Sequence, residues 1–164
     1  KAALMNRAGP TALVFTRQKV PVLDRTQLAP AEGLHQGAYV LWKQDEGSPQ
    51  VIIIGTGSEV HVALEAGRQL AQEGVRVRVV SMPSWRLFDQ QPSAYREGVL
   101  PPGVKARVAV EAGATMGWER YVGLDGAVVG MEGFGASAPG EVLFEKFGIT
   151  AAHVVAQAKA LLRR

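Results

Sequence analysis

The 164-residue sequence contains no cysteine and no long hydrophobic run. The missing cysteine excludes disulfide bonds and thiolate metal sites, and it permits a cytosolic protein without proving one. No apolar segment approaches the ~20 residues that a membrane-spanning helix needs, so we expect no membrane partner. The first residues, KAALMNRAGP, lack an initiator methionine and a signal-peptide layout, so we interpret this end as a cut inside a longer polypeptide.

Blocks of positive charge are equally scarce, although the net charge is +3 and the isoelectric point is near 9.4. The basic residues occur in scattered pairs, without aromatic residues interleaved between them. Nucleic-acid-binding proteins instead gather such residues on one face, so we expect no nucleic-acid partner. The pairs are Arg76 and Arg78, Lys105 and Arg107, and Arg163 and Arg164.

The three histidines, His35, His61 and His153, lie far apart and show no H-x-x-x-H or H-E-x-x-H spacing. The sequence therefore predicts no histidine metal site. His61 shares one helix face with Glu65 and Arg68, which indicates a solvated surface residue. No Ser-His-Asp set can be assembled by spacing either.

Alternation of strand and helix patterns from residue 38 onward predicts an α/β fold. We expect a roughly five-stranded, mixed and mostly parallel sheet with helices on both faces and one antiparallel edge strand. A further buried strand is predicted over 11–16, TALVFT, followed by a linker rich in proline and glycine. The expected strands of the sheet are 38–42, 51–56, 75–82, 106–112 and 126–131.

Strands 38–42 and 51–56 are separated by a segment too short for a crossover helix. We therefore expect these two strands to pair with each other in antiparallel orientation. An amphipathic helix should follow directly, because apolar residues recur at helical spacing from Val60 to Ala71.

The loop Gly55–Ser58 joins the second of these strands to that helix, as a phosphate-binding loop does. A dinucleotide-binding loop needs a third glycine where this sequence has Val60, and it needs an acidic residue after the next strand, which is missing here. The Walker loop needs a lysine, which is also missing. Thr56 and Glu59 instead match the capping box S/T-x-x-E. We interpret the loop as a turn with a helix cap, while a helix start can still attract an anion.

Glu111 ends a predicted parallel strand, where α/β folds gather their functional sites. A functional carboxylate and a residue that caps the next turn both remain open for it.

Several segments resemble the C-terminal end of bacterial transketolases, and they follow one another with matching spacings. The most specific are TRQKVPVLD, SMPSWRLFDQQ and GFGASAPGEVL, with VAVEAGATMGWERYVG between the last two. The resemblance extends over essentially the whole chain. It implies that residues 1–33 are the end of the middle, pyrimidine-binding domain plus a linker, and that residues 34–164 are the transketolase C-terminal domain.

The resemblance also implies a reaction: a cytoplasmic, homodimeric enzyme of the pentose phosphate pathway transfers a two-carbon ketol unit from a ketose phosphate to an aldose phosphate. Thiamine diphosphate and a divalent cation, magnesium or calcium, serve the full-length enzyme. Both bind between the first two domains, so we expect no cofactor, metal or catalytic residue in this chain and no activity of the chain alone. Its implied role is to support the dimer and to anchor the substrate phosphate.

One functional residue of the family carries over by motif. The arginine of the family's S/T-R-Q sequence grips the terminal phosphate of the sugar substrate, and here it is Arg17 in FTRQ. An arginine suits this role because its guanidinium group is always charged and pairs with phosphate oxygens as a fork.

Two alternatives stay open at this point. Sibling thiamine diphosphate enzymes, of the dihydroxyacetone synthase or phosphoketolase type, share the domain plan, although TRQKVPVLD favours transketolase. The second alternative is a free-standing regulatory α/β module that binds an anion at Gly55–Ser58.

Overall fold

Five short strands rich in valine and isoleucine form one sheet in the computed structural model, which describes residues 2–164. The strand order is β1-β3-β2-β4-β5, and every neighbouring pair is parallel except β1 with β3. The predicted α/β class, with a mixed and mostly parallel sheet and one antiparallel edge strand, is confirmed. The strands are β1 (Tyr39–Lys43), β2 (Val51–Gly55), β3 (Val77–Ser81), β4 (Arg107–Ala114) and β5 (Ala127–Met131).

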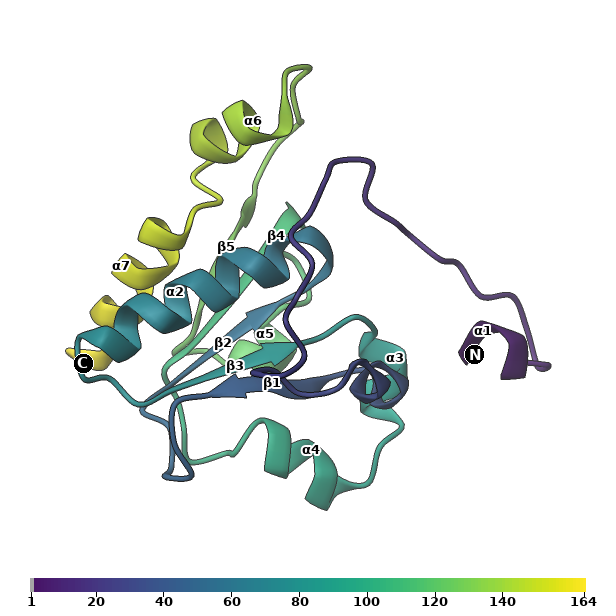
Figure 1. Cartoon of the computed structure of the whole chain (residues 1–164), viewed down its shortest axis with the longest axis horizontal. Helices are drawn as coiled ribbons and strands as arrows, with labels where there is room; N and C mark the ends of the chain where they lie inside the picture. Colours follow the sequence, from purple (N-terminus) through teal and green to yellow (C-terminus); the bar gives the residue numbers. More distant parts are fainter. Residues whose placement is uncertain (1) are drawn as a thin grey trace.

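Helices cover both faces of this sheet (Figure 1). The long helices α2 (Val60–Gln72) and α7 (Ala151–Leu162) pack side by side on one face. The other face carries the shorter helices α3 (Trp85–Asp89), α4 (Ser93–Val99) and α5 (Glu119–Val122). No helix among residues 2–164 is long and apolar enough to cross a membrane. The remaining helices are α1 (Ala2–Met5), α6 (Gly140–Phe147) and the 3-10 turns η1 (Ala31–Gln36) and η2 (Gly57–Glu59).

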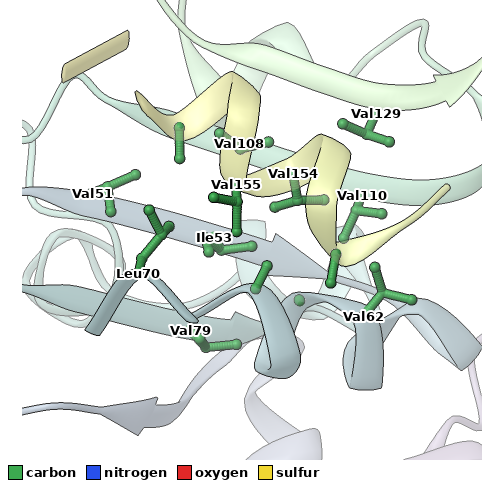
Figure 2. Close-up of a cluster of buried hydrophobic side chains, with 14 of the residues drawn as sticks. Val51, Ile53, Val62, Leu70, Val79, Val108, Val110, Val129, Val154 and Val155 are labelled. Atoms are coloured by element: carbon green, nitrogen blue, oxygen red, sulfur yellow. The ribbon is translucent and has the colours of Figure 1, made fainter. Parts of the chain in front are cut away.

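The main core lies between the sheet and the α2–α7 layer. Figure 2 shows Val155 of α7 and Leu70 of α2 meeting Ile53 of β2 at its centre. Burial of one such side chain contributes roughly 1.5–3 kcal/mol, so this layer supplies a large share of the stability. The helical periodicity read from the sequence for α2 is confirmed.

The predicted pairing of the first two strands is wrong. β1 lies at the edge of the sheet against β3, and β2 lies at the centre between β3 and β4. All residues of β2 are buried, whereas exposure alternates along β1. A strand that is apolar on both faces needs a strand along each edge and a helix layer over each face. β3 therefore lies beside β2, and β1 lies at the edge of the sheet. The connecting segment, residues 44–50, passes the start of β3 and bonds to it through Gln44 and Gln50.

The outer edge of β1 is covered by part of the predicted linker. The N–H of Ala29 donates to the carbonyl of Leu41 at 3.0 Å. Leu28 is only 6% exposed and packs in a small cluster with Leu41 and Leu64. Covering an edge strand in this way blocks pairing with other chains. Residues 23–30 therefore contribute to this folded unit although they form neither helix nor strand.

The strand predicted over residues 11–16 is not formed. Residues 6–22 have no helix or strand, and Leu13 and Phe15 are 62% and 80% exposed. This segment extends away from the sheet to the short helix α1 (Figure 1). A strand needs a partner for its backbone groups, and the five strands of the sheet offer it none.

We expect Leu28→Ala to lower the free energy of unfolding by about 2–5 kcal/mol, because it leaves a cavity beneath the edge strand. Urea denaturation of the 164-residue chain would measure the change. Val22→Ala is the matched control, since that side chain is 98% exposed and its loss should have little effect. Equal effects of the two substitutions would show that residues 23–30 do not belong to the folded unit.

Candidate functional site

The carboxyl ends of β2 and β4 form the place where this fold would be expected to bind a ligand. After β2 the chain passes to β3 on one side, and after β4 it passes to β5 on the other side. The crevice at such a reversal is the usual ligand site of open α/β sheets. Gly55–Ser58 and Glu111 both lie near this edge.

Gly55 is explained by close packing between strand and helix. A Cβ atom at this position would lie 2.9 Å from the Cβ of Ala63 and 3.0 Å from the Cα of Val60. Gly57 has a φ of +54°, a left-handed conformation that favours glycine. The two glycines thus permit the tight turn that the sequence predicts.

The predicted capping box is wrong. Thr56 does precede the 3-10 turn η2, but its side chain accepts no capping hydrogen bond. Glu59 does not reach back to Thr56; it is 4% exposed, and its Oε2 accepts a hydrogen bond of 3.0 Å from the N–H of Ala112 in β4. The hydroxyl of Ser58 donates to its Oε1. The 3-10 turn precedes the α-helix, and it directs the carboxylate toward β4.

Glu59 therefore joins the turn that follows β2 to strand β4 at the point of reversal. A phosphate group bound at the start of α2 would lie beside this carboxylate, and like charges repel. The geometry gives no support to a nucleotide or anion site at Gly55–Ser58. Sequence reasoning missed this hydrogen bond because the S/T-x-x-E pattern had already assigned Glu59 to a helix cap. The sequence feature that could have indicated it is the position of an acidic residue directly before the apolar face of α2.

Glu111 also accepts a buried N–H. Its Oε2 lies 2.7 Å from Nε1 of Trp118, which is fully buried. Trp118 packs edge-on against both Trp85 and Tyr121. The ring centroids of these two pairs are 5.1 Å and 6.1 Å apart, respectively. In the described chain this carboxylate accepts the indole N–H of a core tryptophan and makes no turn-capping hydrogen bond, while a functional role for Glu111 stays a prediction.

The same aromatic cluster holds the most strongly shifted ionisable group. Burial, together with the hydrogen bond from the Tyr121 hydroxyl to Asp89, raises the pKa of Tyr121 to about 12. Asp89 also forms an ion pair with Arg120 at 2.9 Å. A phenol that stays protonated to such a high pH, with its proton held by a carboxylate, is a structural hydrogen-bond donor.

Arg17, the residue assigned to the substrate phosphate, lies exposed in the irregular segment 6–22. Among residues 2–164, no hydrogen bond or ion pair joins it to the carboxyl edge of the sheet. His35 and His153 are exposed, and His61 is half-buried. The described part of the chain contains no group of three His, Cys, Asp or Glu residues that could hold a metal ion.

Comparison with known proteins identifies relatives over almost the whole chain. Residues 37–150 match the family described as the transketolase-like TK C-terminal domain. Transketolase 1 of Escherichia coli is 53% identical over 162 residues, which cover 99% of this chain and 24% of that protein. The chain thus spans about a quarter of the length of the curated relatives that it matches.

Solved structures agree with this relationship. A transketolase from Leishmania mexicana superimposes with a TM-score of 0.73 at 50% identity, covering 81% of this chain and 19% of that one. A transketolase from Pichia stipitis, solved in complex with sedoheptulose-7-phosphate, gives a TM-score of 0.78 at 34% identity, covering 90% of this chain and 20% of that one.

Replacing Glu59 tests the link between the turn η2 and β4. Glu59→Ala removes the acceptor of the Ala112 N–H, a partly buried hydrogen bond, and should lower the free energy of unfolding by about 0.5–1.5 kcal/mol. Glu59→Gln keeps an acceptor oxygen and should lose less. Denaturant melts of both variants would supply the values.

Thr56→Ala is the control, because the side chain of Thr56 makes no capping bond. Its effect should stay within ~0.5 kcal/mol, as for ordinary surface substitutions. A large loss for Thr56→Ala together with a small loss for Glu59→Ala would restore the capping-box interpretation.

Proposed function

This chain belongs to the transketolase family, and we propose that it is the C-terminal part of an enzyme that transfers a two-carbon ketol unit from a ketose phosphate to an aldose phosphate. The observation that carries the proposal is the identity of about half of the residues over nearly the full chain, in one unbroken order. The activity belongs to the whole enzyme, of which this chain spans about a quarter.

We divide the chain into residues 1–33, which end the middle domain, and residues 34–164, which form the C-terminal domain. The exposure of Leu13, Val14 and Phe15 supports this division. These apolar side chains have no partner in the sheet described here, and in the whole enzyme they would be buried in the sheet of the preceding domain. Residues 23–30 would then connect the two domains while covering the edge of β1.

Within this enzyme, Arg17 anchors the terminal phosphate of the sugar substrate. Its guanidinium group is exposed, so its donors are available to a phosphate group. The related transketolase from Pichia stipitis was solved with sedoheptulose-7-phosphate, a substrate type that carries such a group. When the preceding domain is present, a strand over 11–16 would hold Arg17 at a fixed position.

Thiamine diphosphate and a magnesium or calcium ion would bind elsewhere in the whole enzyme, where the cofactor supplies the carbanion chemistry. The residues of this chain do not fit either group. The described residues include no cluster of metal ligands, and the carboxylate of Glu59 at the start of α2 would repel a diphosphate bound there.

A second role of this domain is to support a homodimer. Phe134 is 100% exposed and Met116 is 84% exposed, and both follow strands that end at the carboxyl edge. The segment from Phe134 through α6 projects from the body of the domain (Figure 1). Apolar side chains exposed in this way are suited to contact other parts of the enzyme.

In the full-length enzyme, Arg17→Ala should impair the use of phosphorylated sugars. A hydrogen bond to a charged group is worth about 1.5–3 kcal/mol, so kcat/KM should fall roughly 10- to 150-fold. Most of the loss should be in KM, because the phosphate is remote from the reacting carbons. Arg17→Lys keeps the charge without the fork and should give an intermediate loss.

Steady-state kinetics with two donors separates the phosphate role from a structural one. Hydroxypyruvate has no phosphate, so its constants should hardly change in Arg17→Ala when the acceptor is saturating. Equal losses for phosphorylated and unphosphorylated donors would mean that Arg17 acts structurally.

The isolated 164-residue chain should neither bind thiamine diphosphate nor turn over sugar phosphates. Calorimetry with thiamine diphosphate in the presence of magnesium would test this directly. Stoichiometric, magnesium-dependent binding would place part of the cofactor site in this chain and contradict the proposal.

A further inference from the structure

The turn between α5 and β5 carries an aspartate that is followed directly by a glycine. Residues 123–126 form this turn, in which the N–H of Gly126 donates to the carbonyl of Gly123 at 3.4 Å. Leu124 is 100% exposed, and Asp125 is exposed as well. A hydrogen bond of this length is weak, and an exposed turn opens at little cost in free energy. The backbone nitrogen of Gly126 is therefore not held firmly.

The fold requires a glycine after Asp125. A Cβ atom at position 126 would lie 2.5 Å from the carbonyl oxygen of Val122 and 2.9 Å from that of Arg107. Both oxygens belong to the backbone of packed elements, so they cannot move aside as the end of a flexible side chain could. The packing of α5 against β4 thus places a residue without a side chain next to an exposed aspartate.

Hydrogen bonds hold the carboxylates of the other three aspartates in the chain. Asp24 and Asp45 each accept the backbone N–H two residues further along the chain, at 2.9 and 2.8 Å. Asp89 accepts from two side chains of α5 at 2.9 and 3.1 Å. Within residues 2–164 the carboxylate of Asp125 accepts no hydrogen bond and forms no ion pair. It is therefore free to turn toward its own backbone.

The residue that follows each aspartate sharpens this contrast. Asp24, Asp45 and Asp89 each precede a residue with a long side chain: Arg25, Glu46 and Gln90. Such a side chain crowds the peptide nitrogen and restricts the backbone conformations in which that nitrogen can meet the preceding carboxyl group. Glycine has no Cβ atom and imposes neither restriction. Asp125 is thus the aspartate whose carboxyl group can react most readily with the next peptide nitrogen.

We propose that Asp125 is a modification site at which the chain isomerises spontaneously to isoaspartate. The backbone nitrogen of Gly126 attacks the side-chain carboxyl carbon of Asp125. A C–N bond forms, a C–O bond breaks, and one water molecule leaves with the proton of the nitrogen, which gives a five-membered succinimide. Water then adds to the main-chain carbonyl of this ring and breaks its C–N bond, so the chain continues through the former side chain. The only co-reactant is water, and the site does not depend on the proposed transferase function.

Isoaspartate at this position loosens the start of β5. It adds one carbon atom to the main chain directly before Gly126, whose place is fixed by the carbonyls of Val122 and Arg107. Ala127, the next residue, is paired with Val108 of β4. The lengthened turn cannot keep both the packing of Gly126 and this register. The modification therefore weakens the attachment of the edge strand β5.

Ageing of the folded 164-residue chain at neutral pH and physiological temperature tests the proposal. Isoaspartate is detected through its methylation by an isoaspartyl methyltransferase with S-adenosylmethionine, and proteolytic peptides locate it. It should accumulate several-fold faster at Asp125 than at Asp24, Asp45 or Asp89. Equal rates at the four aspartates would overturn the proposal.

A synthetic peptide of residues 119–131, aged in parallel, shows how much time the reaction needs without the fold. We expect Asp125 to isomerise in the peptide and in the folded chain alike. If the peptide reacts while the folded chain does not, the fold protects the site and the proposal is wrong. It is equally wrong if neither of them reacts.

Asp125→Glu supplies the matched variant. Its longer side chain would have to close a six-membered ring, which forms much more slowly, while the negative charge stays at an exposed position. The methylation signal of the aged chain should therefore disappear in Asp125→Glu and persist in the control Asp24→Glu. An undiminished signal in Asp125→Glu would place the modification at another residue and overturn the proposal.

Amide hydrogen exchange measures the structural consequence. In the isomerised chain the amides of β5 should exchange several-fold faster than in the fresh chain, while those of the central strand β2 should exchange at the same rate. Unchanged exchange of β5 in a fully isomerised sample would overturn the inferred loosening of this strand.

Discussion

The complete burial of β2 is the constraint on which the rest of this structure depends. Ile52, Ile53 and Ile54 have no exposed surface, and they point alternately to the two faces of the sheet. Such a strand is stable only with a strand on each side and a helix layer on each face. That requirement explains why β3 and β4 flank it in parallel, and why β1 is left to the edge even though it directly precedes β2 in the sequence.

The close packing of α2 against β2 also determines the conformation of the loop that follows β2. Gly55 lets the first turn of α2 approach the strand, and this approach brings Glu59 within hydrogen-bond distance of β4. In many α/β proteins the crevice at this point receives a phosphate group. Here a carboxylate of the protein itself takes the N–H of Ala112. In this chain a hydrogen bond within the protein therefore lies where other α/β proteins bind a ligand.

Sequence patterns predicted those features that depend on local periodicity. Helix α2, the five strands and the turn at Gly55–Ser58 all follow from the spacing of apolar residues and glycines. The predictions that were wrong concern features that depend on partners distant in the sequence. The neighbour of β1 is set by the burial of β2, the partner of Glu59 comes from β4, and residues 11–16 need a sheet that these five strands do not supply. Trp118 as the partner of Glu111 is likewise a contact that periodicity does not reveal.

The basic character of the chain also has a structural origin. Arg78 and Arg107, from strands on either side of β2, donate to the carbonyls of residues 98–101 at the end of α4. Both pair in register with Ile52, so the two guanidinium groups flank the central strand. The positive charge of an arginine stabilises the partial negative charge on the last carbonyls of a helix, so such an arginine needs no carboxylate partner. Because Arg78 and Arg107 hold the end of α4 through carbonyl groups, their positive charges add to the net charge of the chain. Arg17 differs from both, because it is exposed and lies outside the folded sheet, which leaves its charge available for a ligand.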